Sequence, residues 1–313
     1  MHLARPILLS TLIVACSSPC ALAQDMSGVE IRTTDLGHGL YMLQGAGGNI
    51  GVSAGADGVV LIDDQFAPLT PKIQAAVRAI SAAPIRFVLN THWHGDHTGG
   101  NQALGEGGSV IVAHHDVRKR LQAGGLMEAF KREVPAAPAA ALPVVTFGDD
   151  LHFHLNGLTL QAQHVAPAHT DGDSFVFFPE ANVLHTGDLY FSDSYPVIDW
   201  GSGGHIRGMI AAIDRMLPLT DGATKVIPGH GALSDRAGMQ AYRDMLATVA
   251  GRVEALVADG KSLEEVRAAK PTAEFDAARG QGFMKVDAWI GMVYEGVRRH
   301  HAAEPKGERP PAH

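Results

Sequence analysis

Cysteine is scarce in this sequence, which contains 2 cysteines and 17 histidines among 313 residues. Both cysteines, Cys16 and Cys20, precede residue 24. If residues 1–23 are removed, the remaining chain has no thiol, which excludes disulfides, thiolate metal sites and a cysteine nucleophile. Any metal must then be bound by His, Asp and Glu, and the excess of histidine favours imidazole ligands.

Basic residues and long apolar runs are also in short supply. Lys and Arg number 25 against 33 Asp and Glu, which gives a net charge of −8. Nucleic-acid binding requires a basic face, so no nucleic-acid partner is expected. The apolar run at 6–15 is too short to span a bilayer, which takes about 20 helical residues. The chain is 46% hydrophobic and 19% charged, as expected of a folded rather than a disordered protein.

The first residues predict an export signal. Arg5 supplies a positive charge, residues 6–15 are apolar, and Ala21-Leu22-Ala23 offers the small-x-small site that signal peptidase requires. We expect residues 1–23 to be a signal peptide and the mature protein to be periplasmic or secreted. The alternative is a lipoprotein acylated on Cys16, because the residues before it loosely match a lipobox.

Strand and helix patterns alternate along the rest of the chain. They predict strands at 58–63, 85–90, 110–113 and 225–228, helices at 67–82 and 205–217, a mostly strand-like region at 144–189, and helices from 233 to about 301. A two-sheet sandwich with outer helices and a three-layer α/β sheet both fit this order. We expect a catalytic domain at 24–235, a helical region at 236–302 packed on it, and a disordered tail at 303–313.

Four side chains of metal-ligating type directly follow the strand at 85–90. They are His92, His94, Asp96 and His97. Alternate residues of an extended segment point the same way, so His92 and His94 can bind one ion together. Asp96 and His97 then face a neighbouring position as the chain turns. Burying this set without a cation would be costly, so the pattern predicts a metal site here.

The run THWHGDHTGGN at 91–101 resembles the signature of the metallo-β-lactamase superfamily. Matching motifs follow in order around His169 (APAHT), Asp188 (HTGD) and His230 (IPGHG), and the resemblance covers about residues 33–233. It implies an α/β fold, a four-layer αββα sandwich that binds one or two metals, usually zinc, in a cleft between its halves. It also implies a first metal bound by His92, His94 and His169, a second bound by Asp96, His97 and His230, and Asp188 as the bridging carboxylate.

Several neighbouring residues receive roles by position. Asp63 and Asp64 end the strand at 58–63 and are candidates for orienting the histidines, with solvated strand-end carboxylates as the alternative. His185 is expected beside the site without ligating, and His114 and His115 at a helix start.

Two loops are expected at the rim of the site. They are Gly45–Asn49 and Ser192–Gly204. The second is irregular and mixes aromatic residues with glycines, so we predict a flexible flap over the substrate, with Tyr195 and Trp200 facing the cleft.

The resemblance implies a reaction class more firmly than a substrate. We expect an exported dinuclear zinc hydrolase, β-lactamase-like, in which a metal-bridging hydroxide aimed by Asp96 attacks the carbonyl of a cyclic amide or ester. Iron or manganese are the alternative metals. Because Asp188 stands where one β-lactamase group has cysteine, a lactonase or a thioesterase of the glyoxalase II type is the first alternative. The tyrosine that lactonases place three residues later is Phe191 here. Further alternatives are an iron-dependent persulfide dioxygenase and a non-catalytic metal-binding protein. The partner is a small-molecule substrate, and nothing indicates the oligomeric state.

Overall fold

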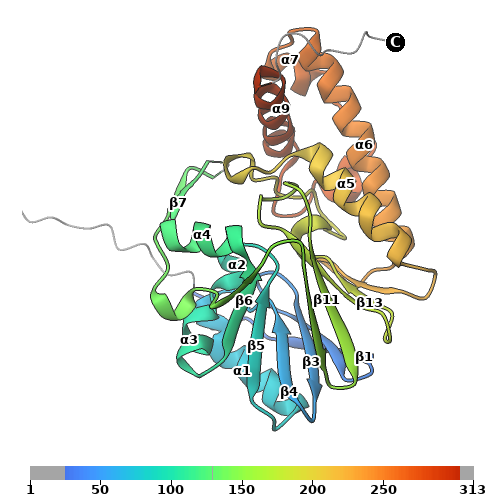
Figure 1. Ribbon diagram of the computed structural model, residues 1–313. Coiled ribbons are helices and arrows are strands. Elements are labelled where there is room, and N and C mark those ends of the chain that lie inside the picture. Colours follow the sequence, from blue (N-terminus) through green and yellow to red (C-terminus); the bar gives the residue numbers. More distant parts are fainter. Residues whose placement is uncertain (1–24, 129, 304–313) are drawn as a thin grey trace, which may run out of the picture.

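Two β-sheets face each other between layers of helices (Figure 1). The structure is a computed structural model that describes residues 25–128 and 130–303. The expected signal peptide, Cys16 and residues 304–313 of the tail expected at 303–313 lie outside these residues, whereas Ala303 still belongs to a helix. Among the residues described, no helix has the length and apolar character needed to cross a membrane.

The first sheet has seven strands. In spatial order they are β1 (Arg32–Gly37), β2 (Leu40–Gln44), β3 (Ile50–Gly55), β4 (Gly58–Ile62), β5 (Ile85–Asn90), β6 (Val110–His114) and β9 (Val145–Phe147). β1 to β4 form an antiparallel meander, and β4, β5, β6 and β9 run parallel. The strands predicted at 58–63, 85–90 and 110–113 are confirmed, whereas the sequence patterns did not predict β1 to β3.

The second sheet has five strands. In spatial order they are β10 (Asp150–Leu155), β11 (Leu158–His164), β12 (Ser174–Phe178), β13 (Val183–His185) and β14 (Lys225–Ile227). β10 to β13 are antiparallel, and β14 pairs parallel to β13. A separate hairpin, which was not predicted, consists of β7 (Gly125–Met127) and β8 (Arg132–Val134).

The helices follow both sheets and dominate the C-terminal part. They are α1 (Thr70–Ile80), α2 (Gly95–Thr98), α3 (Asn101–Glu106), α4 (His115–Ala123), α5 (Ile206–Met216), α6 (Arg236–Ala258), α7 (Leu263–Ala268), α8 (Asp276–Arg279) and α9 (Val286–Ala303). Short 3₁₀ turns are η1 (Ala67–Leu69), η2 (Ala139–Ala141), η3 (Gly187–Leu189), η4 (Trp200–Ser202) and η5 (Leu217–Leu219).

The burial of β4 shows why the fold has four layers. Val60 and Ile62 face inward and pack in the cluster that includes Leu160 and Phe178 of the second sheet. Val59, on the opposite face of β4, packs in the cluster with the apolar side chains of α1. Both faces are therefore covered, which explains an unbroken apolar run in place of an alternating one. The architecture is the αββα sandwich, and the three-layer alternative is wrong.

The C-terminal helices cover the outer face of the second sheet and extend beyond it. One apolar cluster joins Phe175 and Val226 of that sheet to Met209 of α5, Met245 of α6 and Trp289 of α9. In Figure 1, α6, α7 and α9 rise above the strand ends. The division of the chain at residue 235 stays a prediction.

Candidate metal centre

The candidate site lies where two pairs of parallel strands end. β4 and β5 are parallel neighbours in one sheet, and β13 and β14 are parallel neighbours in the other. The histidine motif follows β5, Asp188 lies in η3 after β13, His230 follows β14, and His169 lies in the loop between β11 and β12. The structure brings the seven predicted side chains together in two groups, His92, His94, His169 and Asp188 in one and Asp96, His97 and His230 in the other.

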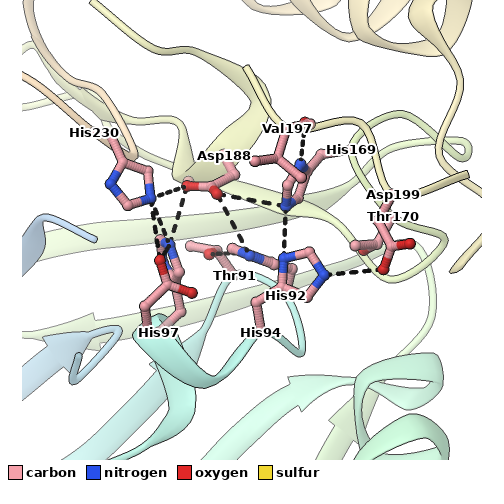
Figure 2. A network of polar contacts seen from close by, with 12 residues as sticks. Thr91, His92, His94, His97, His169, Thr170, Asp188, Val197, Asp199 and His230 are labelled. Atoms are coloured by element: carbon pink, nitrogen blue, oxygen red, sulfur yellow. Dashed lines mark hydrogen bonds and ion pairs between the residues drawn. The ribbon is translucent and has the colours of Figure 1, made fainter. Parts of the chain in front are cut away.

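In the first group, imidazole nitrogens surround one carboxylate oxygen (Figure 2). Oδ2 of Asp188 is 3.8 Å from Nε2 of His92 and 3.4 Å from Nε2 of His169. Nδ1 of His94 lies 2.9 Å from Nε2 of His169. These side chains are almost completely buried, so a charge placed among them would be shielded from bulk water.

The second group faces the other oxygen of the same carboxylate. Oδ1 of Asp188 is 3.0 Å from Nε2 of His97 and 3.4 Å from Nε2 of His230. Oδ2 of Asp96 lies 3.3 Å from Nε2 of His230. The side chains of Asp96 and His230 are each 26% exposed, whereas that of His97 is fully buried. This group therefore forms the side of the site that is open to solvent.

Outer hydrogen bonds fix the tautomer of the site histidines. His97 donates from Nδ1 to Oδ2 of Asp63 at 2.7 Å. The Thr91 hydroxyl donates to the same carboxylate at 2.7 Å and accepts from Nδ1 of His92 at 3.0 Å. His169 donates from Nδ1 to the Val197 carbonyl at 2.7 Å. In the neutral form of each ring, this bond keeps the proton on Nδ1 and leaves Nε2 unprotonated and directed inward.

These features fit a pair of bound metal ions. Nε2 of His92 is buried without a hydrogen-bond partner among the residues described, and a cation would satisfy it. Imidazoles and carboxylates without thiolates suit zinc, and they also suit iron or manganese. The buried His and Asp clusters are thus consistent with a binuclear metal site, while the role of each residue as a ligand remains a proposal.

The charges of the site favour ionised carboxylates. Burial opposes ionisation of Asp188, but His97 and His230 outweigh it and hold the Asp188 pKa well below its usual value. The same balance lowers the pKa of Asp96. Burial lowers the pKa of His169 to about 4, so its ring is neutral. A neutral imidazole and an ionised carboxylate are the forms that bind metal, so His97 and His230, whose pKa values the carboxylates raise against the effect of burial, must lose a proton when a metal binds.

Glycines let the backbone approach the site closely. A Cβ on Gly48 would lie 2.1 Å from Cε1 of His97, and one on Gly229 would lie 2.1 Å from Oδ1 of Asp188. The Gly48 amide also donates to the Asp96 carbonyl at 3.1 Å. The loop predicted at the rim, Gly45–Asn49, therefore packs directly on the second group.

The predicted flap Ser192–Gly204 requires a correction. Tyr195 does not face the cleft. Its ring is buried and stacks on that of Trp289, with the two ring centroids 4.1 Å apart. Its hydroxyl donates to Asp276 at 2.8 Å. Trp200 is half-buried and packs on the C-terminal cluster, where the Arg299 guanidinium lies 3.9 Å from its ring centroid. Both aromatic residues anchor the segment to the helices.

The residues predicted around the site divide into confirmed and corrected assignments. Asp63 orients the His97 ring as expected. The Asp64 carboxylate instead accepts from the Gly100 amide at 2.8 Å, and only the backbone amide of Asp64 reaches a site histidine, donating to the His97 carbonyl at 3.0 Å. His185 ends β13 beside the site and bonds to the Asn49 carbonyl. His114 caps α4, as its position predicted.

Two carboxylates that contact the site were not predicted. Oδ2 of Asp199 accepts from Nε2 of His94 at 3.1 Å. Asp173 accepts from the backbone amides of His169 and Thr170 at 2.7 and 2.8 Å. Asp199 lies in the predicted flap and Asp173 directly before β12, and only their chain positions near Asp188 and His169 could have drawn attention to them.

Comparison with known proteins agrees with this geometry. The sequence profile of the Metallo-beta-lactamase superfamily matches residues 44–230, which is more than half of the chain and includes all seven side chains. The chain belongs to the metallo-β-lactamase superfamily. The resemblance found in the sequence and the fold that it implied are therefore confirmed, and so is metal-dependent hydrolysis as the general class of activity.

Individual relatives are distant and differ in what they act on. An atrochrysone carboxyl ACP thioesterase of Aspergillus terreus is 25% identical over 278 residues, which cover 87% of this chain and 73% of that protein. A hydroxyacylglutathione hydrolase of Nitrosococcus oceani is 28% identical over 162 residues, which cover 51% of this chain and 54% of that protein. A solved metallo-β-lactamase of Pontibacter korlensis superposes with a TM-score of 0.58 at 21% identity, over 70% of this chain and 99% of that one. The chain thus spans about half of the second relative, and the solved structure supports the fold alone.

Proposed function

We propose that this protein is a dinuclear metallohydrolase that cleaves the acyl bond of a small-molecule ester or thioester. The observation that carries the proposal is the position of Asp188. Its Oδ2 faces His92 and His169, and its Oδ1 faces His97 and His230, all within 3.8 Å. A carboxylate that reaches both groups is suited to bridging two ions about 3.5–4 Å apart.

A pair of divalent ions bound here would lower the pKa of a shared water and polarise the substrate carbonyl. The chain's own residues then have distinct tasks. Asp188 holds the two groups together, and Asp96, at the solvent-facing side, accepts a hydrogen bond from the water and aims it. The buried histidines hold their rings in one orientation through Asp63, Thr91 and the Val197 carbonyl. Such preorganisation places charge where the oxyanion develops.

The choice of substrate rests on two lines of support. The thioesterase of Aspergillus terreus aligns over 87% of this chain, which is more than the catalytic domain expected at 24–235 can account for. The protein also has Asp188 where one β-lactamase group has cysteine. We therefore place esters and thioesters first, and cyclic amides such as β-lactams second. Zinc is the proposed metal, with iron and manganese as alternatives.

The experiment is a substrate panel with the purified, zinc-loaded mature protein. The panel contains an acyl thioester, an aryl ester, a lactone and a chromogenic cephalosporin, each with a chelated control. We expect chelator-sensitive cleavage of the thioester or ester to exceed that of the cephalosporin. Faster opening of the cephalosporin would replace our first substrate class by the second. No cleavage of any member by protein that carries two metals would contradict a hydrolytic function.

We further propose that the protein acts outside the cytoplasm. Support comes from the export signal predicted at residues 1–23, which lies outside the described part of the chain. Cell fractionation of the full-length protein, followed by determination of its mature N-terminus, tests this. A mature chain that begins at Gln24 in the periplasmic fraction is expected, whereas an uncleaved chain in the cytoplasm would contradict it.

A further inference from the structure

One segment between the metal centre and the C-terminal helices takes part in the function proposed above only through the Val197 carbonyl. We call residues 191–200 the strap, because this segment runs from just after η3 to the start of η4. Residues 192–200 of the strap belong to the predicted flap Ser192–Gly204, but Tyr195, Ile198 and Asp199 are buried. Its backbone and one of its carboxylates contact two histidines of the first group.

The inner contacts of the strap converge on His94 and His169. The Val197 carbonyl accepts from Nδ1 of His169 at 2.7 Å, and the Asp199 amide donates to the His169 carbonyl at 2.9 Å. Oδ2 of Asp199 accepts from Nε2 of His94 at 3.1 Å (Figure 2). The other oxygen, Oδ1, accepts from the Ser202 amide at 3.3 Å. Asp199 is 0% exposed, so water does not compete for these bonds.

These contacts determine which nitrogen of each ring can bind a metal. A carboxylate and a carbonyl only accept hydrogen bonds, so Nε2 of His94 and Nδ1 of His169 must carry the protons. The unprotonated atoms are then Nδ1 of His94 and Nε2 of His169, which lie 2.9 Å apart. The strap therefore aims both lone pairs at one position.

The outer contacts of the strap are with the C-terminal helices. Tyr195 stacks on Trp289 of α9 with an interplanar angle of 11°, and its hydroxyl donates to Asp276 of α8. The Ile198 amide lies 2.9 Å from the sulfur of Met292 in α9. The guanidinium of Arg279 donates to the Phe191 carbonyl at 3.0 Å. The strap is thus held on one side by helices and holds two histidines on its other side.

We infer that the strap is a positioning element for the first metal ion, in which Asp199 orients His94 and the C-terminal helices hold Asp199 in place. This inference rests on the proposed binuclear centre, but it concerns metal affinity and not the substrate. It assigns the helical region a task that its sequence does not indicate. Outer-shell partners of this kind typically contribute 10–100-fold to metal affinity.

The test is zinc affinity measured by competition with a chromophoric chelator, in the parent, Asp199→Asn and Asp193→Asn proteins. Asp193 is an exposed carboxylate of the same strap and serves as the matched control. In Asp199→Asn, one side-chain oxygen becomes an NH₂ donor, which must face either His94 or the Ser202 amide. If it faces His94, the proton moves to Nδ1 and the ligand atom is lost.

We expect Asp199→Asn to lower the affinity for one of the two zinc ions roughly 10–100-fold. The affinity for the other ion should stay within about twofold of the parent value. The absorption bands of the cobalt-loaded protein should change for the same ion, which a merely structural role would not produce. Parent-like affinity and spectrum, or equal losses in Asp193→Asn, would overturn the inference. A parent that binds two ions without hydrolysing any substrate would contradict the proposed function and leave this result interpretable.

A second variant tests the connection to the helices and covers the case in which Asp199→Asn does not fold. Tyr195→Phe removes the hydroxyl that bonds to Asp276 and keeps the ring that stacks on Trp289. We expect Tyr195→Phe to lower the affinity for the same zinc ion severalfold. Thermal unfolding of the chelated protein, measured alongside, shows whether the variant folds. Loss of affinity at the other ion, or unchanged affinity at both, would contradict the role of the helices.

Discussion

Replacing Gly48 by alanine should damage the metal centre, although Gly48 lies more than 40 residues before the histidine motif. The new Cβ would lie 2.1 Å from Cε1 and 2.4 Å from Nε2 of His97, where ordinary contact begins at 3.4 Å. The ring or the loop must therefore retreat by about 1.3 Å. His97 cannot rotate freely because Asp63 holds its Nδ1 at 2.7 Å. The loop cannot retreat without stretching the bond from the Gly48 amide to Asp96.

The expected magnitude follows from this displacement. Misplacing a reacting group by about 1 Å costs on the order of 10²-fold in rate, which corresponds to roughly 2.7 kcal/mol of transition-state stabilisation. We expect kcat/KM of Gly48→Ala to fall by about that factor on whichever panel substrate the parent cleaves. Zinc affinity should fall at the ion bound by Asp96, His97 and His230, and not at the other.

Gly95→Ala is the matched control. Gly95 lies inside the motif, between His94 and Asp96, yet a Cβ there would meet nothing within 4 Å. It begins α2, where alanine is preferred over glycine. We expect its zinc affinity to equal that of the parent. If Gly48→Ala binds zinc like the parent, or if Gly95→Ala is the more damaged of the two, the packing of the rim loop on His97 does not support the centre.

Three further predictions concern the metal, its ligands and a pair of histidines outside the centre. Chelation with EDTA should abolish hydrolysis and zinc should restore it; activity that survives in protein free of metal by elemental analysis would refute metal dependence. Asp96→Asn and His94→Ala should each reduce turnover by more than the roughly 10–100-fold cost of losing an outer partner, with the circular dichroism spectrum preserved; full activity in both would exclude the proposed roles. His114 stacks on His164 at 3.7 Å, and burial lowers the His114 pKa to about 4 from its ordinary 6.5. The unfolded chain therefore binds the proton first as pH falls from 6.5 towards 4, so the free energy of unfolding declines over this range. His114→Asn keeps an N-cap residue and should lose less stability than the parent between those pH values in denaturant titrations of chelated protein; identical pH dependence would refute this.

The residues of the candidate metal centre were predictable because they lie in short motifs. His92, His94, Asp96 and His97 lie in one stretch of six residues that begins two residues after β5 ends at Asn90. His169 and Asp188 are far apart in the chain, but each lies in a motif of the same superfamily. The strands β4, β5 and β6 were predictable for a similar reason, since continuous apolar runs identify strands that are buried on both faces.

The outer partners were not predictable from pattern alone. Asp199 lies in an irregular segment whose aromatic residues suggested a substrate-facing flap, whereas the segment is buried between the site histidines and the C-terminal helices. The prediction that Tyr195 faces the cleft was wrong because a sequence pattern does not indicate which helix will cover a loop. β1 and β3 escaped prediction because their apolar residues are interrupted by glycines and polar residues, as in Arg32–Gly37 (RTTDLG) and Ile50–Gly55 (IGVSAG), and β2 has only five residues.

The most direct test of the account is a crystal structure of the zinc-loaded protein with anomalous scattering measured at the zinc edge. The account predicts two zinc ions per chain, about 3.5–4 Å apart, with one oxygen of Asp188 on each ion and Nδ1 of His94 on the first. A single ion, or two ions that do not share Asp188, would contradict the binuclear centre on which the proposed hydrolysis depends.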